Sequence, residues 1–134
     1  MKLIRVTLRV RNQQDALLFY TEKLGFVKRA EFPYDQGQYW ITVSPSAEDG
    51  VEIVLQPPEW FDGEEREQHL KYAGHNPPLV FQVENCRATY QEFQSNNVQF
   101  SVPPSERPYG IEADAMDMDG NPLVFLQLPG SMKN

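Results

Sequence analysis

Two short stretches decide the fold: LIRVTLRV, residues Leu3–Val10, and LVFQV, residues Leu79–Val83. The first alternates apolar and polar residues, which is the pattern of a strand with one buried face. The second is a short apolar run of strand length. An asparagine follows each stretch, Asn12 in the first case and Asn85 in the second, and asparagine is favoured as the N-cap of a helix. Each stretch therefore predicts a strand followed directly by a helix.

The two stretches begin a repeat. A shift of 73 positions, the difference between 85 and 12, superimposes them, with Val6 on Leu79, Leu8 on Phe81 and Asn12 on Asn85. Three further strands are predicted after each helix, at Phe26–Phe32, Tyr39–Val43 and Val51–Gln56 and then at Val98–Val102, Ile111–Met116 and Leu123–Leu128. We predict an internal duplication and an α+β fold of two β-α-β-β-β modules. Such modules are too small to be stable alone, so they should pair into a curved mixed sheet with an inner cup and the helices outside.

Proline pairs mark the module boundaries, because proline can neither donate to a sheet nor continue a helix. Pro57-Pro58 and Pro77-Pro78 enclose a polar stretch with a charge run at residues 62–67, which predicts a solvated connector with one or two helical turns. The predicted single domain comprises module 1 (1–58), this connector (59–76) and module 2 (77–130).

Composition excludes several classes of partner. The 134 residues carry a net charge of -7, which argues against nucleic acid and against acidic membranes. One cysteine cannot build a disulfide framework, which suits a reducing compartment. No apolar run approaches the roughly 20 residues of a membrane span, and Met1 leads directly into a strand rather than a signal peptide. We expect a cytoplasmic, soluble protein.

Four segments carry a family resemblance: residues 6–10, VTLRV; 15–20, DALLFY; 23–26, KLGF; and 117–122, DMDGNP. They resemble segments of the vicinal oxygen chelate superfamily, which contains glyoxalase I, bleomycin-resistance proteins and extradiol dioxygenases. The resemblance covers nearly the whole chain and implies the paired-module fold. It does not imply one activity, because the group spans isomerases, dioxygenases, thiol transferases and non-catalytic binding proteins.

The resemblance also implies four metal-ligand positions on the cup face, which fall here on Arg5, Glu52, Pro78 and Val124. An arginine stays protonated and cannot ligate, and proline and valine side chains have no donor atom. A divalent cation needs three or four protein ligands, so we expect no metal and no other cofactor. Glu52 is the only candidate catalytic residue. Arg5 and Glu52 are expected to form an ion pair, and either could instead contact a polar ligand group.

The predicted cup lining is apolar with a few polar anchors, which suits a small organic ligand. The candidate ligand-binding residues are Arg5, Thr7, Glu52, Val54, Val80, Gln82, Tyr109 and Val124. Four aromatic residues are candidates for the mouth of the cup, where they could stack on a planar ligand, with core packing or a dimer contact as alternatives: Trp40, Trp60, Phe61 and Tyr109.

Other polar residues are assigned ordinary roles. His69 and His75 lie in the connector at a spacing that does not match a helical pair, so they are predicted to be surface residues. Cys86 follows the cap Asn85 and is predicted to be a small buried thiol. Asp117 begins a tight turn rather than a calcium loop.

Three functions remain open. The first is a metal-independent small-molecule-binding protein of the glyoxalase/bleomycin-resistance type with a degenerate metal site. The second is a glyoxalase-like lyase or isomerase, or a dioxygenase-type enzyme, that uses Glu52 with or without a metal. The third is a scaffold whose cup is simply packed. A homodimer is expected in each case, with the modules paired within one chain or swapped across a two-fold axis.

Overall fold

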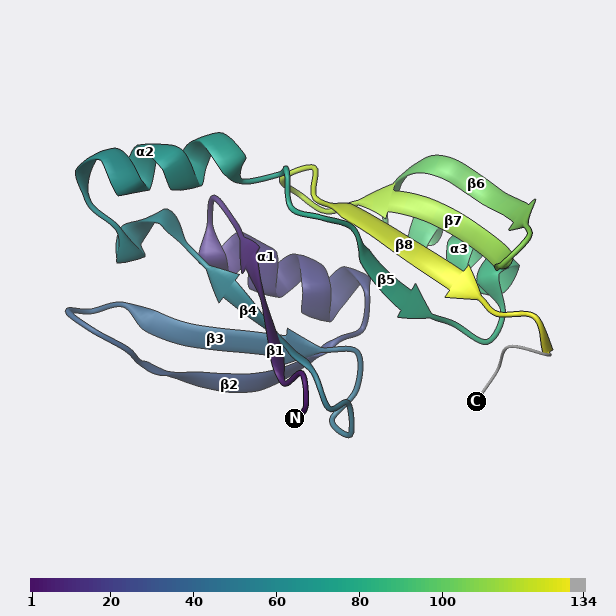
Figure 1. The fold of residues 1–134 in the computed structure, drawn as a ribbon, viewed down its shortest axis with the longest axis horizontal. Helices are drawn as coiled ribbons and strands as arrows, with labels where there is room; N and C mark the ends of the chain where they lie inside the picture. The colour runs from purple at the N-terminus through teal and green to yellow at the C-terminus, as the bar shows by residue number, and fades with distance from the viewer. Residues whose placement is uncertain (131–134) are drawn as a thin grey trace. The chain divides into compact units, whose positions relative to one another are not determined.

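The computed structural model describes residues 1–130 (Figure 1). The chain divides into two compact units, one of residues Met1–Asn76 and one that begins at Pro77. The stretch predicted to be a connector, residues 59–76, belongs to the first unit. Within the described residues, no helix is long and apolar enough to cross a membrane.

The first unit is a four-stranded mixed sheet with helices. Its elements in chain order are β1 (Arg5–Arg9), α1 (Gln13–Leu18), a π-helical turn (Phe19–Lys23), β2 (Val27–Pro33), β3 (Tyr39–Ser44), β4 (Glu52–Gln56), a 3-10 turn (Pro58–Trp60) and α2 (Gly63–Tyr72). The strand order is β1-β4-β3-β2, in which β1 and β4 are parallel and the other pairs are antiparallel.

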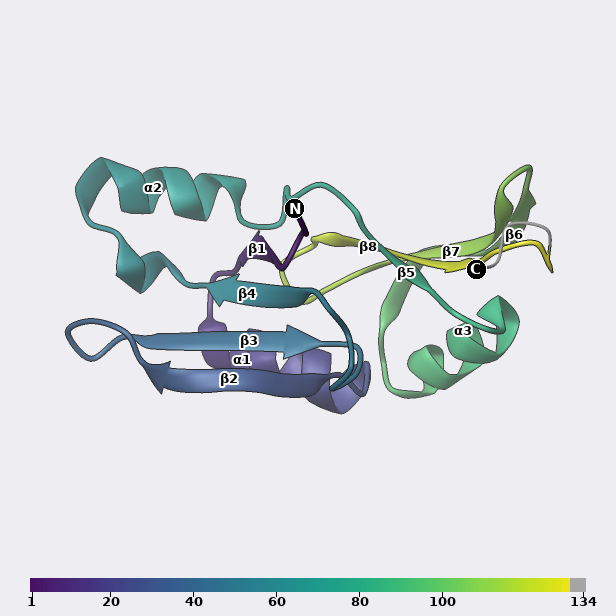
Figure 2. The same ribbon diagram turned by 60° about the horizontal axis from the view of Figure 1, so that its bottom comes forward.

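The second unit repeats this arrangement. It contains β5 (Leu79–Gln82), α3 (Cys86–Ser95), β6 (Gln99–Arg107), β7 (Gly110–Met116) and β8 (Pro122–Gln127). Its strand order, β5-β8-β7-β6, is that of the first unit with each strand replaced by its counterpart. Figure 2 shows α1 beside the first sheet and α3 beside the second. The predicted α+β fold of two β-α-β-β-β modules with outer helices is confirmed. The duplication and the closure of the two sheets into one cup stay predictions.

Both predicted helix caps are present. The Asn12 side chain accepts a hydrogen bond from the Asp15 backbone N–H at 2.9 Å, and Asn85 accepts one from the Ala88 N–H at 3.0 Å. Each bond satisfies one of the free amides of the first helical turn. The chain leaves the first helix through Gly25, whose φ of 73° lies in the left-handed region that favours glycine.

Each sheet packs one face against its helix. In the first unit this face presents Leu8 and Leu55, both essentially inaccessible to solvent, and Tyr20 of the π-helical turn is fully buried with them. In the second unit Phe125 is buried, and its ring lies 5.0 Å from that of Phe93 on α3. The opposite face of each sheet is therefore the one that its helix does not cover.

Cys86 is a buried thiol, as predicted, and its Sγ lies 3.5 Å from the Phe125 carbonyl oxygen. Burial raises the pKa of this thiol, which disfavours the reactive thiolate. Cys86 is therefore a packing residue of the second unit.

The connector differs from its prediction. It contains the ten-residue helix α2 rather than one or two turns, and His69 on this helix, predicted to lie at the surface, is only 3% exposed. Long-range polar contacts explain the difference, because His69 Nε2 donates to the Val10 carbonyl at 2.9 Å and Arg11 Nη2 donates to the Ala73 carbonyl at 3.0 Å. Local sequence does not reveal partners about 60 residues away. His75 is exposed, as predicted.

Candidate functional site

Four predicted site residues lie together on the open face of the first sheet. Arg5 is the register partner of Glu52, and Thr7 is the register partner of Val54, on the parallel strands β1 and β4. Register partners on adjacent strands point to the same side of a sheet. The alternating residue Leu8 points to the helix side, so the four site residues share the face that α1 does not cover.

Four aromatic rings of the same unit lie next to one another, and we call them the aromatic ladder: Phe32, Tyr34, Trp40 and Trp60. The Trp40 and Trp60 ring centroids are 5.7 Å apart with planes only 6° from parallel. Tyr34 stacks on Trp60 at 4.8 Å, and Phe32 lies 6.3 Å from Trp40. Trp40 is two residues before Thr42, the partner of Val54, and therefore points to the open face.

The expected ion pair between Arg5 and Glu52, two residues that the structure describes, is not formed, so this prediction is wrong. Arg5 lies against a ring of the aromatic ladder. Its guanidinium carbon lies 5.8 Å from the centroid of the Trp40 ring, an arrangement in which the ring face attracts the cation. Glu52 Oε1 accepts a hydrogen bond of 2.6 Å from the Thr42 hydroxyl. Thr42 is fully buried, and a buried hydroxyl without an acceptor would be costly, which explains why Glu52 serves it.

The open face of the second sheet carries the other predicted residues. Val80 pairs with Val124 and Gln82 pairs with Leu126 on the parallel strands β5 and β8. On the next strand, β7, Asp114 is the partner of Val124 and Glu112 is the partner of Leu126. Sequence reasoning missed both carboxyl groups. The alternation in the segment GIEADAM, residues 110–116, contains the signal, since its acidic residues take one face of a strand and its alanines the other.

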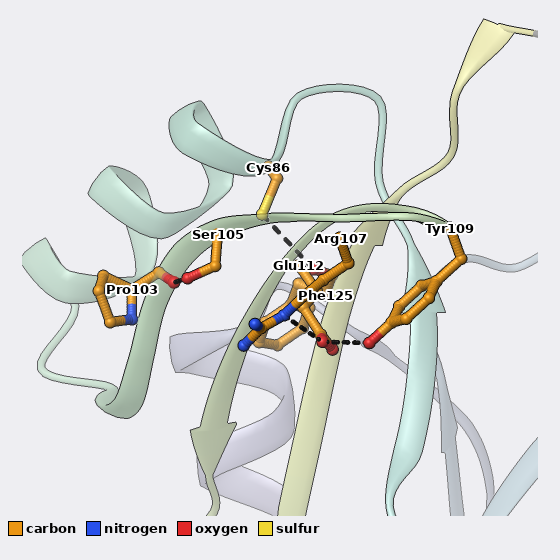
Figure 3. Close-up of polar contacts among 7 residues, drawn as sticks. All are labelled: Cys86, Pro103, Ser105, Arg107, Tyr109, Glu112 and Phe125. Carbon is orange, nitrogen blue, oxygen red and sulfur yellow. Dashed lines mark hydrogen bonds and ion pairs between the residues drawn. The ribbon is translucent and has the colours of Figure 1, made fainter.

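Glu112 is the centre of a polar cluster on this face (Figure 3). It is 9% exposed, and its Oε1 accepts hydrogen bonds from the Tyr109 hydroxyl and from Arg107 Nε, the latter at 3.2 Å. The hydrogen bond from Tyr109, with a further contribution from Arg107, lowers the pKa of Glu112. The same hydrogen bond raises the pKa of Tyr109. Glu112 is therefore held as a carboxylate.

Asp114 behaves in the opposite way to Glu112. Burial, together with the negative charge of Glu112 two residues away, raises the pKa of Asp114. Its Oδ1 is buried, and the described part of the chain provides no hydrogen bond to that atom. Asp114 therefore retains its proton to a higher pH than an ordinary aspartate.

The turn that presents Tyr109 depends on the glycine that follows it. Gly110 has a φ of 140°, and a Cβ at this position would lie 2.3 Å from the Gln127 carbonyl oxygen. No other residue fits such an approach of two backbones. The glycine fixes the β6–β7 turn, and with it the position from which Tyr109 reaches Glu112.

The residues that the family resemblance assigns to metal positions do not fit a divalent cation. Arg5 carries a positive charge, Pro78 and Val124 have no donor atom, and Glu52 contributes the one carboxylate. The register also places Val124 opposite Val80, as it places Val54 opposite Thr7, so Val124 corresponds to Val54 rather than to Glu52. Within residues 1–130 no three histidine, cysteine, aspartate or glutamate side chains are grouped to hold a metal ion.

Comparison with known proteins identifies the family. Residues 2–125 match the model of the Glyoxalase/Bleomycin resistance protein/Dioxygenase superfamily. The Bacillus subtilis (strain 168) protein YurT, which is described as uncharacterized, is 31% identical over 127 residues, or 95% of this chain and 99% of YurT. The crystal structure of UcmS2 is 34% identical with a TM-score of 0.84, over 94% of this chain and 97% of UcmS2.

A further structure shares the fold. It is that of TnmS3, an antibiotic binding protein from Streptomyces sp. CB03234, which is 24% identical with a TM-score of 0.81 and covers 96% of this chain and 97% of its own. The predicted resemblance to the vicinal oxygen chelate group is thus confirmed. The chain belongs to the glyoxalase/bleomycin resistance protein/dioxygenase superfamily.

Proposed function

We propose that the protein binds a small organic molecule with a planar aromatic group, on the open face of the first sheet and without a metal. The observation that carries this proposal is the aromatic ladder, in which the Trp40 and Trp60 planes are 6° from parallel and Tyr34 stacks on Trp60. Phe32 and Tyr34 remain 50% and 54% exposed. Large exposed aromatic side chains grouped on one face are typical of a binding surface.

The polar residues around the ladder suit recognition rather than chemistry. Arg5 keeps its donors beside the Trp40 ring, where they can bond an oxygen of a stacked ligand. The Trp60 Nε1 is buried and has no hydrogen-bond partner within the described residues, so it is a second donor in the same region. Glu52 already accepts from Thr42, which reduces its availability as a general base. The similar fold of TnmS3, an antibiotic binding protein, supports the same class of function.

The oligomeric part of the proposal is a homodimer that acts in the cytoplasm. Two-fold symmetric dimers are the commonest homo-oligomers of soluble proteins. In such a dimer the first and second modules would pair either within one chain or between the two chains. Light scattering after size-exclusion chromatography tests this part, with twice the mass of one 15.5 kDa chain expected and the mass of a single chain against it.

Intrinsic fluorescence tests the binding site directly, because the chain has two tryptophans and both belong to the aromatic ladder. The probe is anthraquinone-2-sulfonate, a planar compound with an anionic group, added to protein in a chelator such as EDTA. We expect saturable quenching. Trp40→Ala should weaken the binding at least about tenfold, while Trp60 remains as the reporter.

The matched control is Tyr90→Phe, which alters an aromatic residue on α3 in the second unit. It should leave the affinity unchanged, and circular dichroism should show that both variants are folded. The proposal would be overturned by quenching that does not saturate, or by equal affinity in the wild type and in Trp40→Ala.

A further inference from the structure

A separate cleft of about 640 Å³ lies within the first unit, between α2 and the carboxyl-terminal ends of β1 and β4. We call it the α2 cleft. Its walls include Arg9 on β1, Phe61 between the 3-10 turn and α2, and several residues of α2 itself. None of the four ladder residues is part of these walls.

One face of α2 lines this cleft. Glu64, Gln68 and Tyr72 are spaced four residues apart, and Glu65 and His69 form the adjacent row of the same face. A helix that packs on a core usually buries an apolar face. This helix turns carboxylate, amide and imidazole groups to the cleft, while its Leu70 remains 40% exposed.

Polar contacts hold α2 in place beside the sheet. His69 Nε2 donates to the Val10 carbonyl at 2.9 Å, and the Asn76 side chain lies between the backbone N–H and the carbonyl of Arg9. At the other end, Arg66 Nε donates to the Phe61 carbonyl at 2.9 Å, which fixes the aromatic wall. The cleft is thus built by specific bonds and not by loose packing.

The His69 side chain, which lines the cleft, also indicates that a ligand binds there. A carbonyl oxygen only accepts, so Nε2 carries the ring proton, and in the neutral ring Nδ1 is an acceptor. The His69 side chain is only 3% exposed. Nδ1 is buried and has no hydrogen-bond partner within residues 1–130. A buried acceptor without a donor is costly, and a donor brought by a ligand would remove that cost.

The charge of the cleft lining indicates which kind of hydrogen-bond donor a ligand would carry. The lining contains two carboxylates, Glu64 and Glu65, against one guanidinium, that of Arg9, and thus has a net negative charge. Phe61 provides an apolar ring in the same wall, 5.4 Å from the imidazole of His69. Cations are attracted both to carboxylates and to the faces of aromatic rings.

We propose that the α2 cleft binds an organic ammonium group attached to an apolar body. The ammonium N–H donates to Nδ1 of His69, the carboxylates of Glu64 and Glu65 balance its charge, and the apolar body lies against Phe61. This site does not depend on the aromatic ladder, so either proposal can fail without the other.

Amide NMR tests the site with three probes of the same shape, which are 2-phenylethylamine, 2-phenylethanol and phenylacetate. The amine should give saturable shifts centred on residues 61–72, below about 10 mM. The alcohol should bind at least about fivefold more weakly, and the anion should produce no saturable shift. Equal binding of the three probes, or no saturable shift with the amine, would overturn the proposal.

Variants separate the roles of the residues. Glu64→Gln combined with Glu65→Gln should weaken amine binding about fivefold to tenfold. The matched control, Glu67→Gln, removes a charge from α2 outside the cleft lining and should leave the affinity unchanged. His69→Gln retains an amide donor for the Val10 carbonyl but replaces the ring acceptor Nδ1 with an amide oxygen at a different position, so it should weaken amine binding at least about fivefold with the fold intact. Unchanged affinity in these cleft variants would contradict the assignment.

Discussion

The two sheets share a topology but differ on their open faces. On the first sheet this face carries Arg5 over Trp40 and a carboxylate, Glu52, bonded to a hydroxyl. On the second sheet it carries a carboxylate, Glu112, bonded by Arg107 and Tyr109. The helix-packed faces, in contrast, are both apolar, and the helix on each of them begins at an asparagine cap. The two units thus share the sheet faces that pack the core, and they differ on the faces where we propose that recognition takes place.

The largest expected effect tests the shared faces. Leu55→Ala and Phe125→Ala each remove a buried side chain from the helix-packed face of one sheet. Each should lower the free energy of unfolding by about 3 to 5 kcal/mol, because the lost contacts leave a cavity. Urea denaturation followed by circular dichroism measures both. A loss below about 1 kcal/mol in either variant would show that the two faces are not equivalent.

A smaller effect distinguishes the two carboxylates. Glu112→Gln should cost about 1 to 2 kcal/mol at neutral pH, because it weakens hydrogen bonds to a charged group. Glu52→Gln should cost less than about 1 kcal/mol, because an amide oxygen still accepts from Thr42.

The pH dependence of the Glu112 variant has a definite sign. The folded state lowers the pKa of Glu112, so its contribution is complete above the pKa of an unfolded glutamate. The contribution is lost as the pH falls through the lowered pKa. The stability difference between wild type and Glu112→Gln should therefore shrink in acid, and denaturation at a series of pH values measures it. A constant difference across the acid range would argue against the described cluster.

The smallest effect compares the two helix caps. Asn12→Ala and Asn85→Ala each remove one side-chain acceptor from a helix N-terminus and should each cost about 1 kcal/mol. Thermal unfolding provides the measurement, and aspartate at the same positions should restore most of the loss. If one cap were neutral, the apparent equivalence of the two modules would not extend to their helix starts.

Much of the fold follows from local sequence. The alternation in residues 3–10, the caps Asn12 and Asn85 and the stop at Gly25 predict the elements that the structure contains. The length of α2 and the burial of His69 do not follow, because they depend on bonds to Val10 and Arg11 that are remote in sequence. Of the site, the strand faces were predictable from alternation. The partners of the charged groups were not predictable from alternation, because Arg5 lies over the Trp40 ring and Glu52 accepts a hydrogen bond from the Thr42 hydroxyl.

Calorimetry can test the proposal that the first sheet recognises a ligand without a metal. The affinity of anthraquinone-2-sulfonate is measured by calorimetry on chelator-treated protein and on the same protein with added zinc, nickel or manganese ions. We expect the same Kd in all samples, because Glu52 is the one possible ligand among the four residues that the family resemblance assigns to metal positions. Binding that appears only when a stoichiometric metal is present would contradict it.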